Sequence, residues 1–319
     1  SLDSSNNILE QLKLEQEEAV KMALVSAIGA SCQYALDPTS KIKLDPEVRR
    51  EALSYASIYL VSDANEKAVL GADVMRKLLE QNGLSNEDSS RYLNLLLERY
   101  NRENTNNVFL KVELLNVMGT LCGQSVYKEK AKILFVPLFS AALYNKSDAI
   151  REAAVSGLIA SQRAEALKIF RERELYRDNS QTIRNKIISL AGEVGSDSDL
   201  QWLWQIYGQK QEADMYIWEQ MGKILERSNA DVVNQWLGSI NSNTIEGKVS
   251  KEQIVGLLEM LVTKAEAENK SQVVSEARRQ LAEIYRSGGD YDRAMEYYAQ
   301  LRDTAASDNE KEGYLAEIM

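Results

Sequence analysis

The sequence predicts an all-α protein, an α–α superhelix in which antiparallel helix pairs stack as a solenoid. Three observations favour this class. The 319 residues include only 3 Pro and 16 Gly, few turn-forming residues for a β-sandwich or a doubly wound sheet of this length. Apolar residues recur with a period near 3.6, and no stretch shows the alternation typical of a strand. Segments of the chain also resemble one another at fixed spacing, as they do in repeat arrays.

An apolar residue followed by a basic one opens several predicted helices. The clear instances are Val48-Arg49, Ile150-Arg151 and Ile183-Arg184, and the weaker ones are Val20-Lys21 and Leu110-Lys111. A glycine lies eight positions after the basic residue at Gly29, Gly119 and Gly192, and Gly222 is assigned as a later member of the set. A glycine inside a helix costs roughly 1 kcal/mol relative to Ala. Its recurrence at one offset predicts that a second helix packs closely against each of these positions.

The region around residue 145 resembles the HEAT and armadillo repeat families. Pro137-Leu138 stands in the first helix, which bends at a Pro in that family, and Ile150-Arg151 opens the second helix. Asn145 replaces the family's Asp between the two helices, and Asn also forms turns through its local backbone. The resemblance implies HEAT- or armadillo-like helical repeats over residues 1–245.

Polar stretches without helical periodicity mark the predicted breaks between helices. They fall at Asp37-Pro38, Asn82-Gly83, 101–107, 145–147 and 239–246. The last is the most polar, so we place the boundary between two repeat types there. The acidic run 15–18 is predicted instead to lie inside a helix, on its solvated face.

The C-terminal region repeats over a longer interval. Leu-Ala-Glu-Ile occupies 281–284 and again 315–318, an interval of 34 residues. The residues between resemble the tetratricopeptide family. Its first helix would contain Leu281, Ala282 and Tyr285 and end at Gly288-Gly289, its turn would be Gly289-Asp290-Tyr291, and its second helix would contain Ala294 and Tyr298. Ala306 stands in place of the family's final Pro. The resemblance implies tetratricopeptide-like repeats over 246–319, with the last unit cut in mid-repeat.

Charge and cysteine usage limit the partners and the compartment. The chain has 38 basic and 48 acidic residues, a net charge of −10, and no basic run, so we expect no nucleic-acid binding. No apolar run approaches the roughly 20 residues that span a bilayer, so we expect no membrane insertion. Cys32 and Cys122 both lie in apolar helical stretches, as buried thiols of a reducing compartment do, which favours the cytoplasm. Because the chain starts at Ser1 and stops in mid-helix at Met319, we expect a fragment whose targeting segment can have been removed.

The sequence lacks residues that most catalytic and metal sites require. It contains no histidine, which excludes histidine acid–base catalysis, Ser-His-Asp and Cys-His sites, and imidazole-bound zinc or haem. Two cysteines cannot form a Cys₄ metal site. Gly247-Lys248 lacks the leading Gly and the following Ser or Thr of a phosphate-binding loop. We therefore expect no catalytic residue, no metal and no cofactor.

The candidate partner-binding residues lie in two places. In tetratricopeptide repeats, peptides bind the concave face of the first helices, and the resemblance assigns Glu276, Arg279, Glu283 and Arg286 to that face. Their spacing of three and four puts them on one stripe, which can alternatively consist of ion pairs of about 0.3 kcal/mol each. Trp202 and Trp204 point to different sides of one predicted helix, so one of them is a candidate exposed hot spot. The alternative is that both lie in crowded solenoid cores.

These features predict a non-catalytic protein–protein interaction scaffold or adaptor that binds proteins or peptides on solenoid surfaces. The alternative is a regulatory subunit that modulates an enzyme bound to it. A less favoured alternative is a HEAT-like enzyme of the glycosylase or lyase type. A glycosylase would need a basic groove, which the net charge disfavours.

Overall fold

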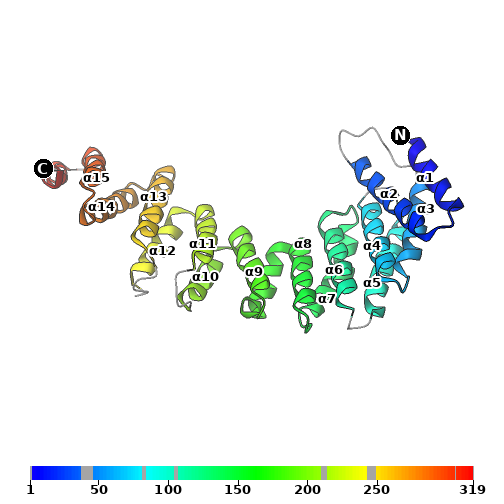
Figure 1. Cartoon of the computed structure of the whole chain (residues 1–319). Coiled ribbons are helices and arrows are strands. Elements are labelled where there is room, and N and C mark those ends of the chain that lie inside the picture. Colours follow the sequence, from blue (N-terminus) through cyan, green and yellow to red (C-terminus); the bar gives the residue numbers. More distant parts are fainter. Residues whose placement is uncertain are drawn as a thin grey trace. The chain divides into compact units, whose positions relative to one another are not determined.

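The computed structural model describes residues 2–36, 46–80, 84–103, 107–209, 214–242, 249–305 and 307–318. Within these ranges the chain forms helices and no strand, which confirms the predicted all-α class. The chain divides into two compact units, residues 1–187 and 188–319, and each unit is described by itself. Figure 1 labels the helices of both units.

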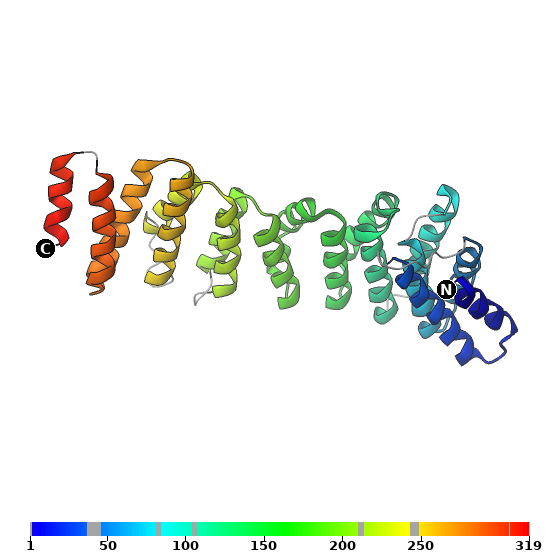
Figure 2. The same ribbon diagram turned by 90° about the horizontal axis from the view of Figure 1, so that it is seen from above.

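Unit 1 consists of helix pairs. Its elements are α1 (Leu2–Leu14), α2 (Glu18–Leu36), α3 (Pro46–Leu60), α4 (Asn65–Leu79), α5 (Asn86–Arg102), α6 (Val108–Gln124), α7 (Lys128–Ala142), α8 (Asp148–Glu172), the 3₁₀ turn η1 (Leu175–Arg177) and the start of α9 (Gln181–Val194). The odd-numbered helices α1, α3, α5 and α7 contact one another in order, and so do α2, α4, α6 and α8, which we call the even row. Each odd helix from α1 to α7 also contacts the even helix that follows it. This packing between neighbouring helices, visible in Figure 2, is consistent with a helical repeat solenoid.

Three of the recurring glycines lie where two helices approach each other closely: α2 and α4, α6 and α8 in the even row, and α9 and a helix of unit 2. A Cβ added at Gly29 would lie 3.0 Å from Cγ2 of Val74 in α4, and one at Gly119 would lie 3.1 Å from Cα of Gly157 in α8. Gly192 likewise faces a neighbouring helix, α11 (Met215–Arg227), whose backbone would lie 3.1 Å from an added Cβ. The predicted close packing is therefore confirmed at these three positions. It is wrong at Gly222, where an added Cβ would have no neighbour within 4 Å among the described residues.

The described chain confirms two of the predicted breaks. α5 ends at Arg102 and α6 begins at Val108, while α7 ends at Ala142 and α8 begins at Asp148. Outside the described residues lie Asp37-Pro38, Asn82-Gly83, Gly247-Lys248, Ala306 and the predicted domain boundary between 245 and 246. The side chain of Cys32 also lies outside them.

Two stretches differ from the prediction for local reasons. Residues 15–17 are not helical and separate α1 from α2, whereas a continuous helix was predicted. The Glu15 carboxylate accepts hydrogen bonds from the backbone N–H groups of Gln16 and Glu17, at 2.7 and 2.8 Å, which competes with helical bonding and lowers the pKa of Glu15. Conversely, the helix α12 (Ala230–Ser242) continues through residue 242 instead of ending at 239, because Ile240 buries its side chain in the core.

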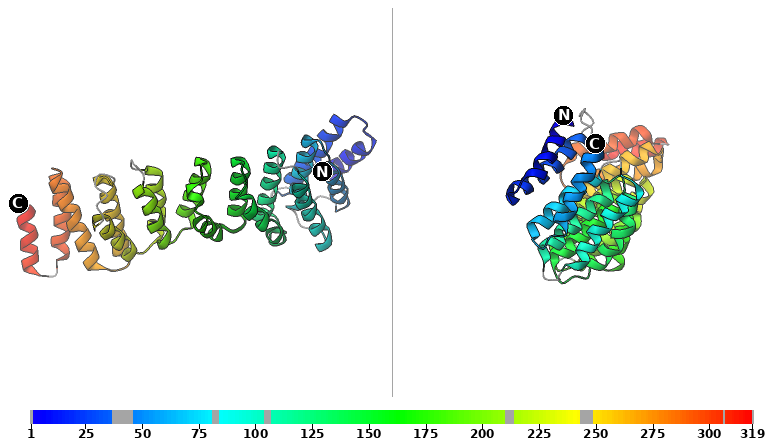
Figure 3. Two further views of the ribbon diagram at one scale, coloured as in Figure 1. Left: turned by 90° about the horizontal axis from the view of Figure 1, so that it is seen from below. Right: turned by 90° about the vertical axis from the view of Figure 1, so that its right-hand side faces the viewer.

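Unit 2 continues with α10 (Asp197–Gln209), α11, α12, α13 (Lys251–Ala267), α14 (Ser271–Ser287), α15 (Tyr291–Thr304) and α16 (Asp308–Ile318). From α12 onward each helix contacts the next one (Figure 3). Ala282 and Ala294 are buried where α14 and α15 pack together, and Gly289, with φ of 80°, provides the turn between them. The two helices and the turn between them confirm the predicted helix–turn–helix. The turn ends at Asp290, whose side chain caps α15 by accepting a hydrogen bond from the backbone N–H of Arg293.

Cationic side chains near helix ends bind the C-terminal carbonyls of helices in the preceding pair. Arg99 in α5 donates to two carbonyls at the end of α3, at 2.9 and 3.2 Å. Arg227 in α11 does so at the end of α9, at 2.7 and 3.1 Å, and Lys264 in α13 at the end of α11, at 2.8 Å twice. These bonds satisfy carbonyls that a helix end leaves open, and the positive charge is favourable there. They tie successive pairs together within each unit.

No helix in the described ranges combines the length and the apolar character that crossing a bilayer requires.

Candidate binding surfaces

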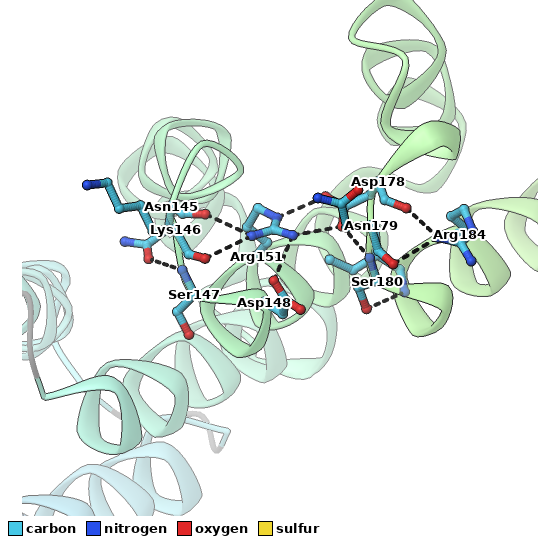
Figure 4. A network of polar contacts seen from close by, with 10 residues as sticks. Asn145, Lys146, Ser147, Asp148, Arg151, Asp178, Asn179, Ser180 and Arg184 are labelled. Atoms are coloured by element: carbon cyan, nitrogen blue, oxygen red, sulfur yellow. Dashed lines mark hydrogen bonds and ion pairs between the residues drawn. The ribbon is translucent and has the colours of Figure 1, made fainter.

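Arg151, at the start of α8, holds two loops in place (Figure 4). Its Nη1 donates to the carbonyls of Asn145 and Lys146, at 3.0 and 3.3 Å. Its Nε and Nη2 donate to the two carboxylate oxygens of Asp178, both at 2.8 Å, and Nη2 also pairs with Asp148 at 2.9 Å. The guanidinium group of Arg151 therefore joins the loop before α8 to the loop before α9.

The same device recurs one repeat later. Nη1 of Arg184 donates to the carbonyls of Asp178 and Asn179, which lie six and five positions before it, the same offsets as those of Arg151 (Figure 4). The hydrogen bonds from Arg151 hold the pKa of Asp178 below its ordinary value despite its burial. The arginine of the helix-opening pair thus has a structural role, which the sequence pattern alone did not specify.

Cys122 of α6 is a free, buried cysteine. Burial raises the pKa of the Cys122 thiol to about 12, so this thiol stays protonated at neutral pH and is a poor nucleophile. Across the described ranges, no three side chains of His, Cys, Asp or Glu lie together as a metal ion would require.

The predicted stripe on α14 is exposed. Glu276, Arg279, Glu283 and Arg286 all lie at the surface of this helix. Arg279 pairs with Glu276 along the helix at 2.6 Å, and Arg286 pairs with Glu317 of α16. The stripe therefore combines an intrahelical ion pair with a contact to a neighbouring helix. Its binding of a peptide stays a prediction.

The two candidate tryptophans are buried. Trp202 and Trp204 expose 8% and 7% of their surface, as the core alternative describes. The Trp204 ring stacks on Tyr207, with centroids 5.5 Å apart, and meets Trp236 of α12 edge-on at 5.0 Å. Trp204 and Trp236 also border a shallow depression of about 250 Å³ between α10 and α12. A role of either Trp202 or Trp204 in partner binding stays a prediction, and the small exposure leaves little area for it.

A larger groove lies between α4 and α6 in the even row, and the sequence did not indicate it. It has a volume of about 660 Å³, and we call it the Phe109 groove. The α4 wall consists of Glu66, Val69, Leu70, Asp73 and Arg76, spaced as one helical stripe.

The α6 wall of the groove consists of Phe109, Glu113, Asn116, Val117 and Thr120, which also share one face of their helix. Phe109 exposes 60% of its surface, although aromatic side chains are normally well buried. The groove therefore combines an exposed aromatic side chain with a concave apolar floor.

The charges of the groove are unevenly compensated. Arg76 is held by Asp73 and Glu80, at 2.7 and 2.6 Å, and Lys77 binds the other oxygen of Asp73 at 2.7 Å. Burial acts to raise the pKa of Asp73, but the hydrogen bonds from Lys77 and Arg76 outweigh it, so that pKa lies below its ordinary value. The basic groups beside the groove are thus already paired.

The two remaining acids of the groove differ from Asp73. Among the described residues, neither Glu66 nor Glu113 forms an ion pair. Glu66 lies one turn before Leu70 on α4, and Glu113 lies one turn after Phe109 on α6. Each wall therefore carries an acid without a cationic partner next to an apolar side chain.

A second depression, of about 440 Å³, lies on the other side of α6, against α8. Asn116 and Thr120 line both depressions and form the ridge between them. Small residues, including Gly119 and Gly157, line this second depression and let the two helices approach. It lacks an exposed aromatic side chain.

Sequence reasoning missed the Phe109 groove because its depth depends on the separation of two helices that are far apart in sequence. One local signal was available: Phe109 directly precedes the helix-opening pair Leu110-Lys111, of which both members are buried, so Phe109 falls on a different face.

Comparison with known proteins yields structural similarities alone. No family model matches the sequence, and no curated protein is similar to it. An engineered protein of known structure is similar over 98% of this chain and 87% of its own, with 9% identity and a TM-score of 0.46. An aminopeptidase A of Legionella pneumophila, in complex with aspartic acid, is similar over 98% of this chain and 38% of its own, with 12% identity and a TM-score of 0.39. At these scores neither similarity carries an argument about family or function.

Proposed function

We propose that this chain is a non-catalytic scaffold or adaptor that binds partner proteins or peptides on the surfaces of its stacked helices. The observation that carries this proposal is Phe109, an aromatic side chain that is 60% exposed in a groove of about 660 Å³. Aromatic side chains in concave apolar surfaces are typical of protein-binding sites. The stripe of Glu276, Arg279, Glu283 and Arg286 is a second candidate surface, since all four side chains are exposed on one helix.

We further propose HEAT- or armadillo-like repeats over 1–245 and tetratricopeptide-like repeats over 246–319. The two rows of helices in unit 1 and the recurring loop contacts of Arg151 and Arg184 support the first assignment. The buried Ala282 and Ala294 at the packing of α14 and α15 support the second. A cytoplasmic location also belongs to this proposal, because Cys122 is a free buried thiol, as expected in a reducing compartment.

The alternative functions meet different observations. A regulatory subunit would use the same surfaces, and it differs from a scaffold only if the activity of the bound enzyme changes. A HEAT-like glycosylase would need a basic groove, whereas in the Phe109 groove Glu66 and Glu113 form no ion pair with any described residue. Support for a HEAT-like lyase would need a reactive site, and we propose none. We therefore place a scaffold before a regulatory subunit, and both before an enzyme.

Site-specific photocrosslinking in a cell extract tests the proposed function. The chain carries p-benzoylphenylalanine in place of Phe109 or, as the control, in place of Ile133, which is 76% exposed on α7. We expect a discrete protein adduct from position 109 and none from position 133. The same adducts from both positions, or none from 109, would contradict the proposal. A third site in place of Glu283 tests the α14 stripe in the same way.

A further inference from the structure

We propose that the Phe109 groove binds a short linear segment of a partner protein, in which an apolar side chain is flanked by lysine or arginine. This inference rests on the proposed function and adds the chemistry of the partner. Three properties of the groove lead to it: its length, its apolar floor and its charge.

The length of the groove favours a peptide over a folded domain. On α4 its wall runs from Glu66 to Arg76, which corresponds to about 15 Å of helix at 1.5 Å per residue. An extended segment of about five residues spans this distance at roughly 3.3 Å per residue. The polar contact between Asn107 and Asn65, at 2.8 Å, ties the starts of α6 and α4 together at one end of the groove. Because α4 and α6 also pack directly against each other, the fold holds both walls of the groove, which lowers the cost of ordering on binding.

The apolar residues that line the groove favour an apolar side chain of the partner. Val69 and Leu70 are half-buried on one wall, and Phe109 is mostly exposed on the other. A volume of about 660 Å³ accommodates several side chains. An aliphatic or aromatic residue of the partner would remove the Phe109 ring from water, and this burial is the main source of affinity.

The charge of the groove selects basic residues beside that apolar one. Glu66 and Glu113 lie within one turn of the apolar positions, and neither forms an ion pair among the described residues. Arg76 and Lys77 are already bound by carboxylates, so they do not offset these acids. A lysine or arginine on either side of the apolar residue would supply the missing countercharges.

The charge of the whole chain disfavours the nearest rival occupant, a second copy of the protein. With a net charge of −10, two copies repel each other, whereas a basic segment is attracted to the surface before it binds. An acidic partner is disfavoured for the same reason.

The test is a selection of random peptides of about twelve residues, displayed in vitro, against the whole chain. We expect the selected peptides to share an apolar residue with at least two Lys or Arg within about four positions of it. A representative peptide is then synthesised, labelled with fluorescein and titrated with the chain by fluorescence anisotropy.

Variants of the chain separate the contribution of the Phe109 ring to binding from that of the two acids. Phe109→Ala should weaken binding about tenfold or more, and the double variant Glu66→Gln/Glu113→Gln about fivefold at low salt. The effect of the double variant should fall below about twofold at 0.5 M salt, because screening weakens charge contacts. The controls are Ile133→Ala, which removes another exposed apolar side chain, and Glu87→Gln/Glu98→Gln, which makes the same charge change on α5. Both controls should bind within about twofold of the original chain.

Three outcomes would overturn the inference. Selection of acidic or uncharged apolar peptides whose binding requires Phe109 would show that the partner chemistry is wrong, while the groove as a binding surface would stand. Basic peptides that bind all variants equally would show that they do not use the groove. A dimer in sedimentation that Phe109→Ala dissociates would make a second copy the occupant. The crosslinking at position 109 decides the proposed function separately, since it does not depend on the charge of the partner.

Discussion

Replacing Arg151 by alanine should destabilise unit 1 far more than replacing an exposed arginine of the same unit. Arg151 makes two hydrogen bonds of 2.8 Å to the Asp178 carboxylate and two more to loop carbonyls. Its side chain is 12% exposed and that of Asp178 only 7%. Removing one partner of a buried charge pair typically costs about 3–5 kcal/mol. Because the Asp178 carboxylate would still accept a hydrogen bond from the backbone N–H of Ser180, at 2.8 Å, we expect a loss of unfolding free energy at the low end of this range, about 3 kcal/mol.

Urea denaturation followed by far-ultraviolet circular dichroism measures this cost. Arg151→Lys keeps the charge but loses the two-pronged geometry, so it should lie between the original chain and Arg151→Ala, at about 1–2 kcal/mol. The control is Arg50→Ala, which removes an ion pair to Glu47 whose side chains are 69% and 64% exposed and should cost less than about 0.5 kcal/mol. Equal midpoints for Arg151→Ala and Arg50→Ala would refute the reasoning.

Three further predictions follow from the packing and the pKa shifts. Gly71→Ala should destabilise the chain by about 2 kcal/mol or more, because its Cβ would lie 2.3 Å from a backbone nitrogen, whereas Gly222→Ala should raise stability by up to about 1 kcal/mol; thermal unfolding distinguishes the two signs. Because the pKa of Asp178 is lowered in the folded state, the stabilisation by its carboxylate should be complete above the unfolded pKa of about 3.9 and disappear as the pH falls through the folded value. The difference in unfolding free energy between the original chain and Asp178→Asn, measured from pH 7 to pH 2, should therefore shrink, and a constant difference would contradict this. Cys122 should react with a thiol reagent only at the rate at which the fold opens, so a rapid reaction in native buffer would show that its burial is wrong.

The sequence predicted those features that depend on local interactions. The turn between α14 and α15 needs a residue with positive φ, and the pair Gly288-Gly289 indicates it directly. Gly119 and Gly192 indicated close helix packing because a glycine inside a helix has a cost that only packing or function offsets. Gly222 differs from them, since an added Cβ there would have no described atom within 4 Å.

Other features depend on interactions that a pattern of residue types does not contain. The break at 15–17 arises because the Glu15 side chain bonds to its own backbone, although the local composition is helical. The role of Arg151 depends on Asp178, which is 27 residues away, and so only the recurrence of an arginine was visible. The Phe109 groove depends on the separation of α4 and α6, and the exposure of Trp202 and Trp204 on the packing of α10 against its neighbours. Sequence patterns therefore predict the helices better than they predict the distances between helices.

The most direct test of the scaffold proposal is the affinity of the chain for the protein that crosslinks at position 109, measured by isothermal titration calorimetry with purified components. The account predicts that Phe109→Ala lowers this affinity about tenfold or more, while Ile133→Ala leaves it within about twofold of the original value. Equal affinities for the two variants would contradict the claim that partners bind in the groove between α4 and α6.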